Sequence, residues 1–220
     1  MISVAVFDRP QWNIAEIKRY ARIMGEDSAA ESLIEDCIVE AEPALSYKVC
    51  YTTESVIREE NILRIGSIRT LSQTLKKALF DCEQAVIFAA TVGTPYDRLI
   101  AKYSRLSPAK ALILQAIGAE RAEALCDAFV SRYAAEHDCR LKTRVSPGYG
   151  DIPLALQRDI FAMLDCPRKI GLTLNESLLM SPSKSVTAFA GITCGNHEQN
   201  EGKCSSCDNL DCEYRIQRYL

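Results

Sequence analysis

The chain has 220 residues, of which 48% are hydrophobic and 25% are charged, and its formal net charge at pH 7 is −3. Such values are typical of a soluble globular protein with a buried core, and the slight negative charge argues against a chain built to coat nucleic acid or an anionic membrane. No apolar run approaches the length of a membrane span, and the apolar residues before Asp8 are too few for a secretory signal. We therefore expect a cytoplasmic protein that binds neither nucleic acid nor membrane.

The first 45 residues have the spacing of helices. Ile14, Ile17 and Ala21 recur at helical intervals, and Gly25 follows as a typical C-cap. A second helix is predicted after an N-cap at Asp27 or the serine that follows it, and it ends before the next proline. We interpret residues 1–45 as an N-terminal helical segment.

Residues 46–192 mix strands and helices without the regular alternation of a doubly wound fold. Alternating and apolar runs predict strands at 47–52, 62–65, 85–90, 170–176 and 185–192. Helical spacing predicts helices at 70–80, from 94, at 108–136 and at 153–164. The pattern indicates the α+β class, with residues 46–192 as the core.

Two of the predicted helices have recognisable starts. Thr94 is a predicted N-cap before Pro95, and Ser107 is a predicted N-cap before Pro108. The long helix that follows Pro108 is expected to turn Leu112 and the apolar residues at helical spacing after it toward the core.

The loop between the long helix and the next helix carries the most informative residues, in the sequence RVSPGYGDIP. Gly148 lets backbone amides approach a ligand closely, and Arg144 can hold a carboxylate through two hydrogen bonds. Tyr149 adds an aromatic face and a hydroxyl group. A ligand with a carboxylate and a flat base would suit this loop, and a purely structural turn is the alternative.

The motif R-x-x-x-G-Y, followed by a short helix and IGLTLNESLLMSPSKSVTAFAGI, resembles the activation domain of cobalamin-dependent methionine synthase. The likeness is close from Arg144 to Ile192 and looser back to about Tyr47, and it includes neither the first helices nor the end of the chain. The resemblance implies a mixed or antiparallel twisted sheet flanked by helices. The corresponding residues of the later stretch are Leu174, Asn175, Glu176, Ser177, Met180, Pro182, Ser185 and Val186.

The resemblance also implies a binding site for S-adenosylmethionine, formed by Arg144, Gly148 and Tyr149. The family carries an acidic residue near the sulfonium of the ligand, and here Asp127, two places before Phe129, corresponds to it. A carboxylate there would offset the positive charge of the ligand, although aspartate is shorter than the family's glutamate.

The alternative for this acidic residue is a solvated helix face. Glu120, Glu123 and Asp127 fall on one side of the long helix, as solvent-exposed carboxylates commonly do. The sequence leaves both interpretations open.

Four of the ten cysteines, Cys194, Cys204, Cys207 and Cys212, crowd into the end of the chain. Four thiolates can complete a metal site, and the spacing is similar to the cluster motif of corrinoid iron–sulfur proteins, except that the fourth cysteine lies upstream. We interpret residues 193–220 as a metal-binding tail, in which an iron–sulfur cluster, zinc and an unmetallated tail remain open. His197 could replace one ligand. The remaining cysteines are expected to be small buried apolar residues.

The resemblance implies that the protein reactivates a corrinoid protein, methionine synthase or a similar one, in trans. In this reaction an electron donor reduces cob(II)alamin on the partner, and S-adenosylmethionine methylates the product. No catalytic residue is identified. The alternatives are a methyltransferase of small molecules, which the absence of a glycine-rich nucleotide loop disfavours, and a non-catalytic corrinoid-protein-binding or sensor module with a structural zinc tail.

Overall fold

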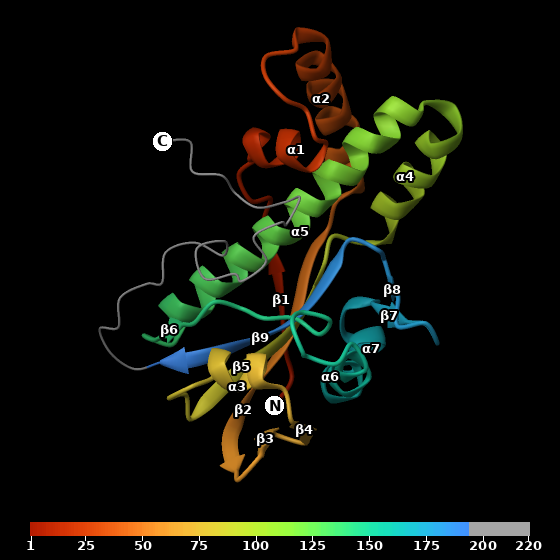
Figure 1. Cartoon of the computed structure of the whole chain (residues 1–220). Coiled ribbons are helices and arrows are strands. Elements are labelled where there is room, and N and C mark those ends of the chain that lie inside the picture. Colours follow the sequence, from red (N-terminus) through yellow and green to blue (C-terminus); the bar gives the residue numbers. More distant parts are fainter. Residues whose placement is uncertain (194–220) are drawn as a thin grey trace.

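The computed structural model describes residues 1–193, which form one antiparallel sheet with helices on both faces and a small two-stranded sheet (Figure 1). The predicted α+β class, with a sheet flanked by helices, is confirmed.

In chain order the elements are β1 (Ser3–Phe7), α1 (Ile14–Tyr20), α2 (Ser28–Ala41), η1 (Glu42–Ala44), β2 (Tyr47–Glu59), β3 (Ile62–Ile65), β4 (Ile68–Thr70), α3 (Gln73–Ala78), β5 (Gln84–Thr91), α4 (Thr94–Leu106), α5 (Pro108–Glu136), β6 (Arg140–Leu141), α6 (Leu156–Leu164), α7 (Cys166–Ile170), β7 (Thr173–Leu174), β8 (Met180–Ser181) and β9 (Ser185–Thr193). The main sheet has the order β4-β3-β2-β5-β9-β6, and β1 also pairs with β2.

Strand β5 is the centre of the sheet. It pairs with β2 on one side and with β9 on the other, and after its first residue every side chain is buried. Successive residues point to opposite faces, so Phe88 enters one core and Ile87 enters the other. The apolar run at 85–90, which predicts a strand, is therefore a strand that is buried on both faces.

The sheet separates two cores. Helices α1, α2, α4 and α5 cover one face, where Phe129 of α5 lies 4.8 Å from Phe88 and 5.0 Å from Tyr51 between ring centroids. Helices α3, α6 and α7 cover the other face, where Leu75 and Ile160 are fully buried (Figure 1). Because α5 and α6 lie on opposite faces, the segment that joins them passes around the edge of the sheet.

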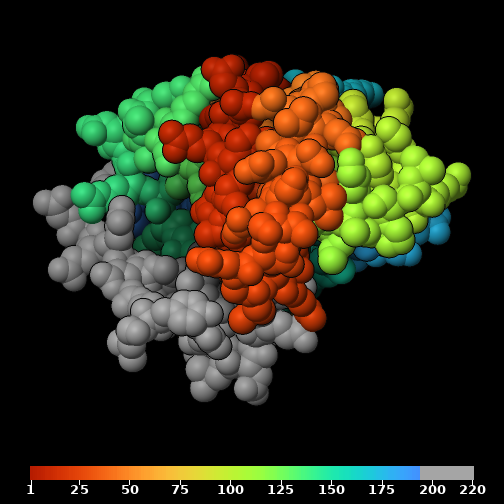
Figure 2. All heavy atoms as spheres, turned by 90° about the horizontal axis from the view of Figure 1, so that it is seen from above, coloured from red at the N-terminus to blue at the C-terminus, as the bar shows by residue number. Residues whose placement is uncertain are grey.

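The N-terminal segment contains a strand that was not predicted. β1 pairs with the first residues of β2 and extends the sheet, and Ile17 and Ile34 are buried in the same core as Phe88. Figure 2 shows this segment across the middle of one end of the molecule, between α4 and the C-terminal part of α5. The description of residues 1–45 as helical is wrong for β1, because a run of five residues has too little periodicity and its pairing with β2 decides its structure.

The helix starts follow the sequence only in part. Ser107 is the N-cap of α5, and its hydroxyl accepts a hydrogen bond from the amide of Lys110 at 3.4 Å. Thr94 is not an N-cap, because α4 already begins there and Gly93 occupies the cap position. Leu112, expected in the core, is exposed. None of the helices described, including the 29-residue α5, is long and apolar enough to cross a membrane.

The strand predicted at 170–176 is mostly absent. Helix α7 extends to Ile170, and only Thr173–Leu174 is a strand, which pairs with Met180–Ser181 rather than with β9. The resulting hairpin precedes the turn at 182–184, where Asp97 of α4 accepts hydrogen bonds from both the amide and the hydroxyl of Ser183. The turn is therefore fixed to α4.

Candidate functional site

The loop predicted to bind a ligand follows the short edge strand β6 and passes around the sheet beside β9. Lys142 donates a backbone hydrogen bond to Gly191 at 2.8 Å, and Val145 and Phe189 exchange two backbone hydrogen bonds of 3.0 and 2.9 Å. In such extended backbone neighbouring side chains point to opposite faces, so Val145 packs on the core beneath α6 while Arg144 turns toward α5. The path of the chain therefore places Arg144 against the long helix.

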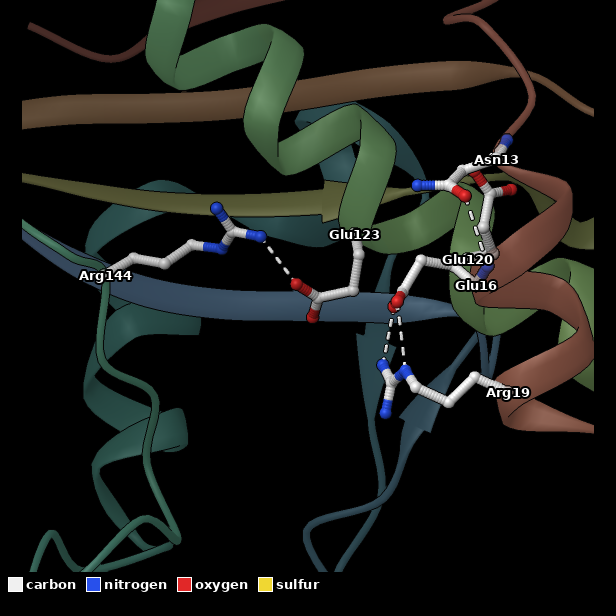
Figure 3. A network of polar contacts seen from close by, with 6 residues as sticks. All are labelled: Asn13, Glu16, Arg19, Glu120, Glu123 and Arg144. Carbon is white, nitrogen blue, oxygen red and sulfur yellow. Dashed lines mark hydrogen bonds and ion pairs between the residues drawn. The ribbon is translucent and has the colours of Figure 1, made fainter. Parts of the chain in front are cut away.

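The guanidinium of Arg144 meets two carboxylates of α5. It pairs with Glu123 at 2.5 Å and with Asp127, which lies one helical turn further along (Figure 3 shows the pair with Glu123). The Arg144 side chain is only 9% exposed, whereas those of Glu123 and Asp127 are 38% and 61% exposed. A buried cation is thus held by two carboxylates that solvent can reach.

The structure brings together two of the predicted site residues, Arg144 and Asp127. It adds Glu123, for which the sequence indicates only a place on a solvated helix face. The spacing of Glu123 and Asp127 is the sequence signal for this cluster, because residues four apart on a helix are neighbours on its surface. Burial opposes the charge of Arg144, but interactions with Cys126, Glu123 and Asp127 outweigh this effect and raise the pKa of the guanidinium.

Gly148 and Tyr149 lie further along the same loop. Gly148 has a φ of 91°, in the region that favours glycine, and its amide donates a hydrogen bond to the carbonyl of Ile152 at 2.9 Å. Tyr149 is 68% exposed, so much of its side chain is open to solvent. These two residues form the tip of the loop beyond the sheet edge, whereas Arg144 lies at its base.

The third acidic residue, Glu120, has a different environment. It is 3% exposed and pairs with Arg121, which also donates to the carbonyls of Pro10 and Gln11, each at 2.7 Å. The amide of Asn13 donates to Glu120 as well, at 3.2 Å. The expectation of a solvated face is therefore wrong for Glu120, because the N-terminal segment covers it.

A hollow of about 530 Å³ lies at another place, between the end of β1 and η1. Tyr47 and Lys48 line it, and the sheet register places Lys48 level with Ser185 at the start of β9, four residues before Phe189 and two strands away from it. The surface around Arg144 is thus separate from this hollow.

The predicted metal ligands Cys194, Cys204, Cys207, Cys212 and His197 lie outside the described residues. Among residues 1–193 no group of three or more histidine, cysteine, aspartate or glutamate side chains could hold a metal ion. Of the six cysteines in this part, five are buried, in line with their interpretation as apolar residues, and Cys139 is half-buried.

Neither the models of known protein families nor the curated proteins include a match to this chain. Among solved structures, the chain is similar to that described as "Crystal Structure of the MetH Reactivation Domain bound to AdoHcy", with a TM-score of 0.63 and 15% sequence identity. The match covers 87% of this chain and 78% of that chain. The chain therefore shares its α+β fold, an antiparallel sheet flanked by helices, with the reactivation domain of MetH.

Proposed function

We propose that this protein binds S-adenosylmethionine and reactivates a corrinoid protein in trans, by reductive methylation of cob(II)alamin on methionine synthase or a similar partner. The observation that carries the proposal is the contact between Arg144 and Asp127. The resemblance assigns both residues to the methyl donor, although one lies on a loop and the other on α5. The fold likeness supports the same ligand class, because the related solved domain is bound to AdoHcy.

The charges of the cluster match those of the proposed ligand. S-adenosylmethionine carries a carboxylate, an ammonium and a sulfonium, so its carboxylate would pair with Arg144 while its cationic groups face Glu123 and Asp127. Each charged group would exchange one partner for another, which keeps every charge paired. The open carboxylates make this exchange feasible, since they are exposed in the free protein.

The tip of the loop would hold the rest of the ligand. Gly148 allows close approach of the backbone, and the exposed ring of Tyr149 offers a face on which the adenine can stack. The turn at 182–184, fixed to α4 through Asp97 and Ser183, would help to form the surface that receives the partner.

In the proposed reaction the partner's reduced cobalamin is the methyl acceptor. A separate one-electron donor reduces cob(II)alamin, the methyl group leaves the sulfonium, and S-adenosylmethionine becomes S-adenosylhomocysteine. This chain binds and orients the methyl donor, S-adenosylmethionine. Such positioning accounts for much of the rate acceleration when two reactants must meet in one geometry.

The deciding experiment has two stages. Calorimetry first measures S-adenosylmethionine binding to the full chain, and absence of heat would contradict the proposal. The protein, S-adenosylmethionine and a chemical reductant are then mixed with a corrinoid partner. The absorption spectrum is expected to change from that of cob(II)alamin to that of methylcobalamin. If the donor binds but the spectrum of every corrinoid protein of the organism stays unchanged, the chain is a donor-binding sensor.

We also propose that the cysteine tail binds metal while residues 1–192 fold without it. Residues 1–192 supply the buried side chains of both cores that the structure describes. Removal of residues 193–220 is expected to abolish the metal content and to leave a single cooperative thermal transition. Elemental analysis of the full chain distinguishes iron with sulfide from zinc. Loss of cooperative unfolding in the shortened protein would show that the tail belongs to the core.

A further inference from the structure

The far end of the ligand loop is joined to α3, a helix almost eighty residues earlier in the chain. The carboxylate of Asp151 accepts hydrogen bonds from the hydroxyl of Ser72 at 2.6 Å, from the amide of Gln73 at 2.6 Å and from the amide of Thr74 at 2.9 Å. Three donors thus converge on one side chain of the loop.

These donors need a partner because the first amides of a helix have no acceptor within the helix. The Ser72 hydroxyl already caps α3, because it accepts a hydrogen bond from the amide of Leu75 at 3.1 Å. The same hydroxyl donates its hydrogen bond to Asp151. The bond from Ser72, followed by those from the amides of Thr74 and Gln73, holds the pKa of the Asp151 carboxyl well below its usual range. The carboxylate therefore remains charged, and the contact persists, at pH values where other aspartates are protonated.

Close approach of the loop to α3 also requires a glycine. Gly150 has a φ of 55°, and a Cβ atom added to it would lie 2.5 Å from the hydroxyl oxygen of Thr74. Any side chain at 150 would thus push the loop away from α3, which makes Gly150 part of the same contact as Asp151.

The contact reaches the tip of the loop through two hydrogen bonds. Ile152, next to Asp151, donates to the carbonyl of Tyr149 and accepts from the amide of Gly148, both at 2.9 Å. The other end of the loop is held on β9 by Val145. Both ends are therefore fixed, and the tip that carries Gly148 and Tyr149 spans the distance between them.

We infer that Asp151 is a positioning residue, which holds Gly148 and Tyr149 in the conformation that binds the ligand by joining their loop to α3. The inference rests on the proposed function of this loop as the S-adenosylmethionine site. Asp151 itself has no predicted contact with the ligand, and it acts through Ile152 and the backbone of the tip.

The test compares Asp151→Ala and Asp151→Asn with Asp27→Ala and Asp27→Asn in the full chain. Asp27 is a matched control, because it too is an exposed aspartate that accepts hydrogen bonds from two amides at a helix start, those of Ala29 and Ala30 at 3.0 Å. Amide hydrogen exchange of residues 148–152 and calorimetric affinity for S-adenosylmethionine are measured on all variants.

We expect faster exchange at Gly148 and Ile152 in the Asp151 variants, with the larger change in Asp151→Ala. If the conformation in which the loop contacts α3 falls to about a tenth of the population, the apparent affinity for S-adenosylmethionine falls about tenfold. The reason is that only this fraction of the protein binds the ligand. The Asp27 variants are expected to change neither quantity, even where they lower the thermal stability equally.

Unchanged exchange at 148–152 in Asp151→Ala would overturn the positioning role, whatever the ligand result. Faster exchange with unchanged affinity would overturn the link between this contact and binding. If the wild-type protein binds no S-adenosylmethionine, the proposed function fails and the inferred role in binding fails with it, while the exchange data still decide whether Asp151 orders the loop.

Discussion

Helix α5 takes part in two arginine–carboxylate clusters on neighbouring turns, and their environments differ. In the first, Arg121 and Glu120 are 0% and 3% exposed, and the guanidinium also lies 4.0 Å from the ring centroid of Trp12 and donates to two backbone carbonyls. In the second, Arg144 is nearly as buried, but its carboxylates are open to solvent. The first cluster has its partners enclosed, whereas the second can exchange them.

This difference separates a structural ion pair from a candidate binding site. Arg121 ties the N-terminal segment to α5, because its hydrogen bonds reach Pro10 and Gln11, more than a hundred residues away. A ligand cannot enter without dismantling that contact. Arg144 is held by two partly exposed carboxylates, so the carboxylate of a ligand can replace them on the guanidinium at a lower free-energy cost.

The largest effect on stability is expected from Arg121→Ala. It leaves the Glu120 carboxylate buried without its partner, and loss of one member of a buried pair costs about 3–5 kcal/mol of unfolding free energy. Urea unfolding measures the change. The double variant Glu120→Leu with Arg121→Met serves as the comparison, because it removes both charges, and it is expected to be less destabilised than Arg121→Ala. A single variant as stable as the wild type would contradict the structural role.

Arg144→Ala is expected to affect binding rather than stability. Loss of a charge-assisted bond worth ~1.5–3 kcal/mol weakens S-adenosylmethionine binding by about ten- to a hundredfold. The unfolding free energy should fall by about 1 kcal/mol or less, because Glu123 and Asp127 regain water. Calorimetry and urea unfolding measure the two effects. Equal affinity in wild type and variant would remove Arg144 from the site.

Glu123→Gln is expected to reduce the preference for S-adenosylmethionine over S-adenosylhomocysteine. The two ligands differ by the positive sulfonium. A partly exposed carboxylate near the sulfonium contributes about 1 kcal/mol to the binding free energy, or roughly a fivefold ratio of affinities. Competition calorimetry with both ligands measures this ratio. Glu31→Gln, which changes a half-exposed carboxylate paired with Lys18, is the control and should leave the ratio unchanged. A ratio that is the same in Glu123→Gln would show that the sulfonium does not lie near Glu123 and would leave Asp127 as its predicted neighbour.

The smallest effect is expected from Glu136→Gln at the end of α5. Its pair with Arg132 is about half exposed on both sides, with side chains at 49% and 47%. Pairs of this kind on a helix surface contribute little to the free energy of unfolding, because solvent and salt screen them. Urea unfolding at low and high salt should show a small difference that salt removes. A loss of unfolding free energy as large as that of Arg121→Ala would mean that solvent exposure does not decide how much an ion pair of α5 contributes to stability.

Local sequence properties were sufficient for several features of this protein. The buried strand β5 follows from an apolar run, the start of α5 from Ser107 and Pro108, and the irregular loop at 144–153 from its prolines and glycines. These features depend on neighbouring residues, because capping, backbone φ and burial of a whole run are short-range preferences.

Only the tertiary structure decided which charged residues meet. Glu120 and Glu123 are three positions apart on one helix, yet the N-terminal segment encloses the first and Arg144 contacts the second. The contact of Asp151 with Ser72 and the addition of β1 to the sheet likewise join segments far apart in the chain. Such contacts depend on where distant segments of the chain lie on the sheet and which path joins them. No local spacing contains that path, because it follows from the packing of both cores on the two faces of the sheet.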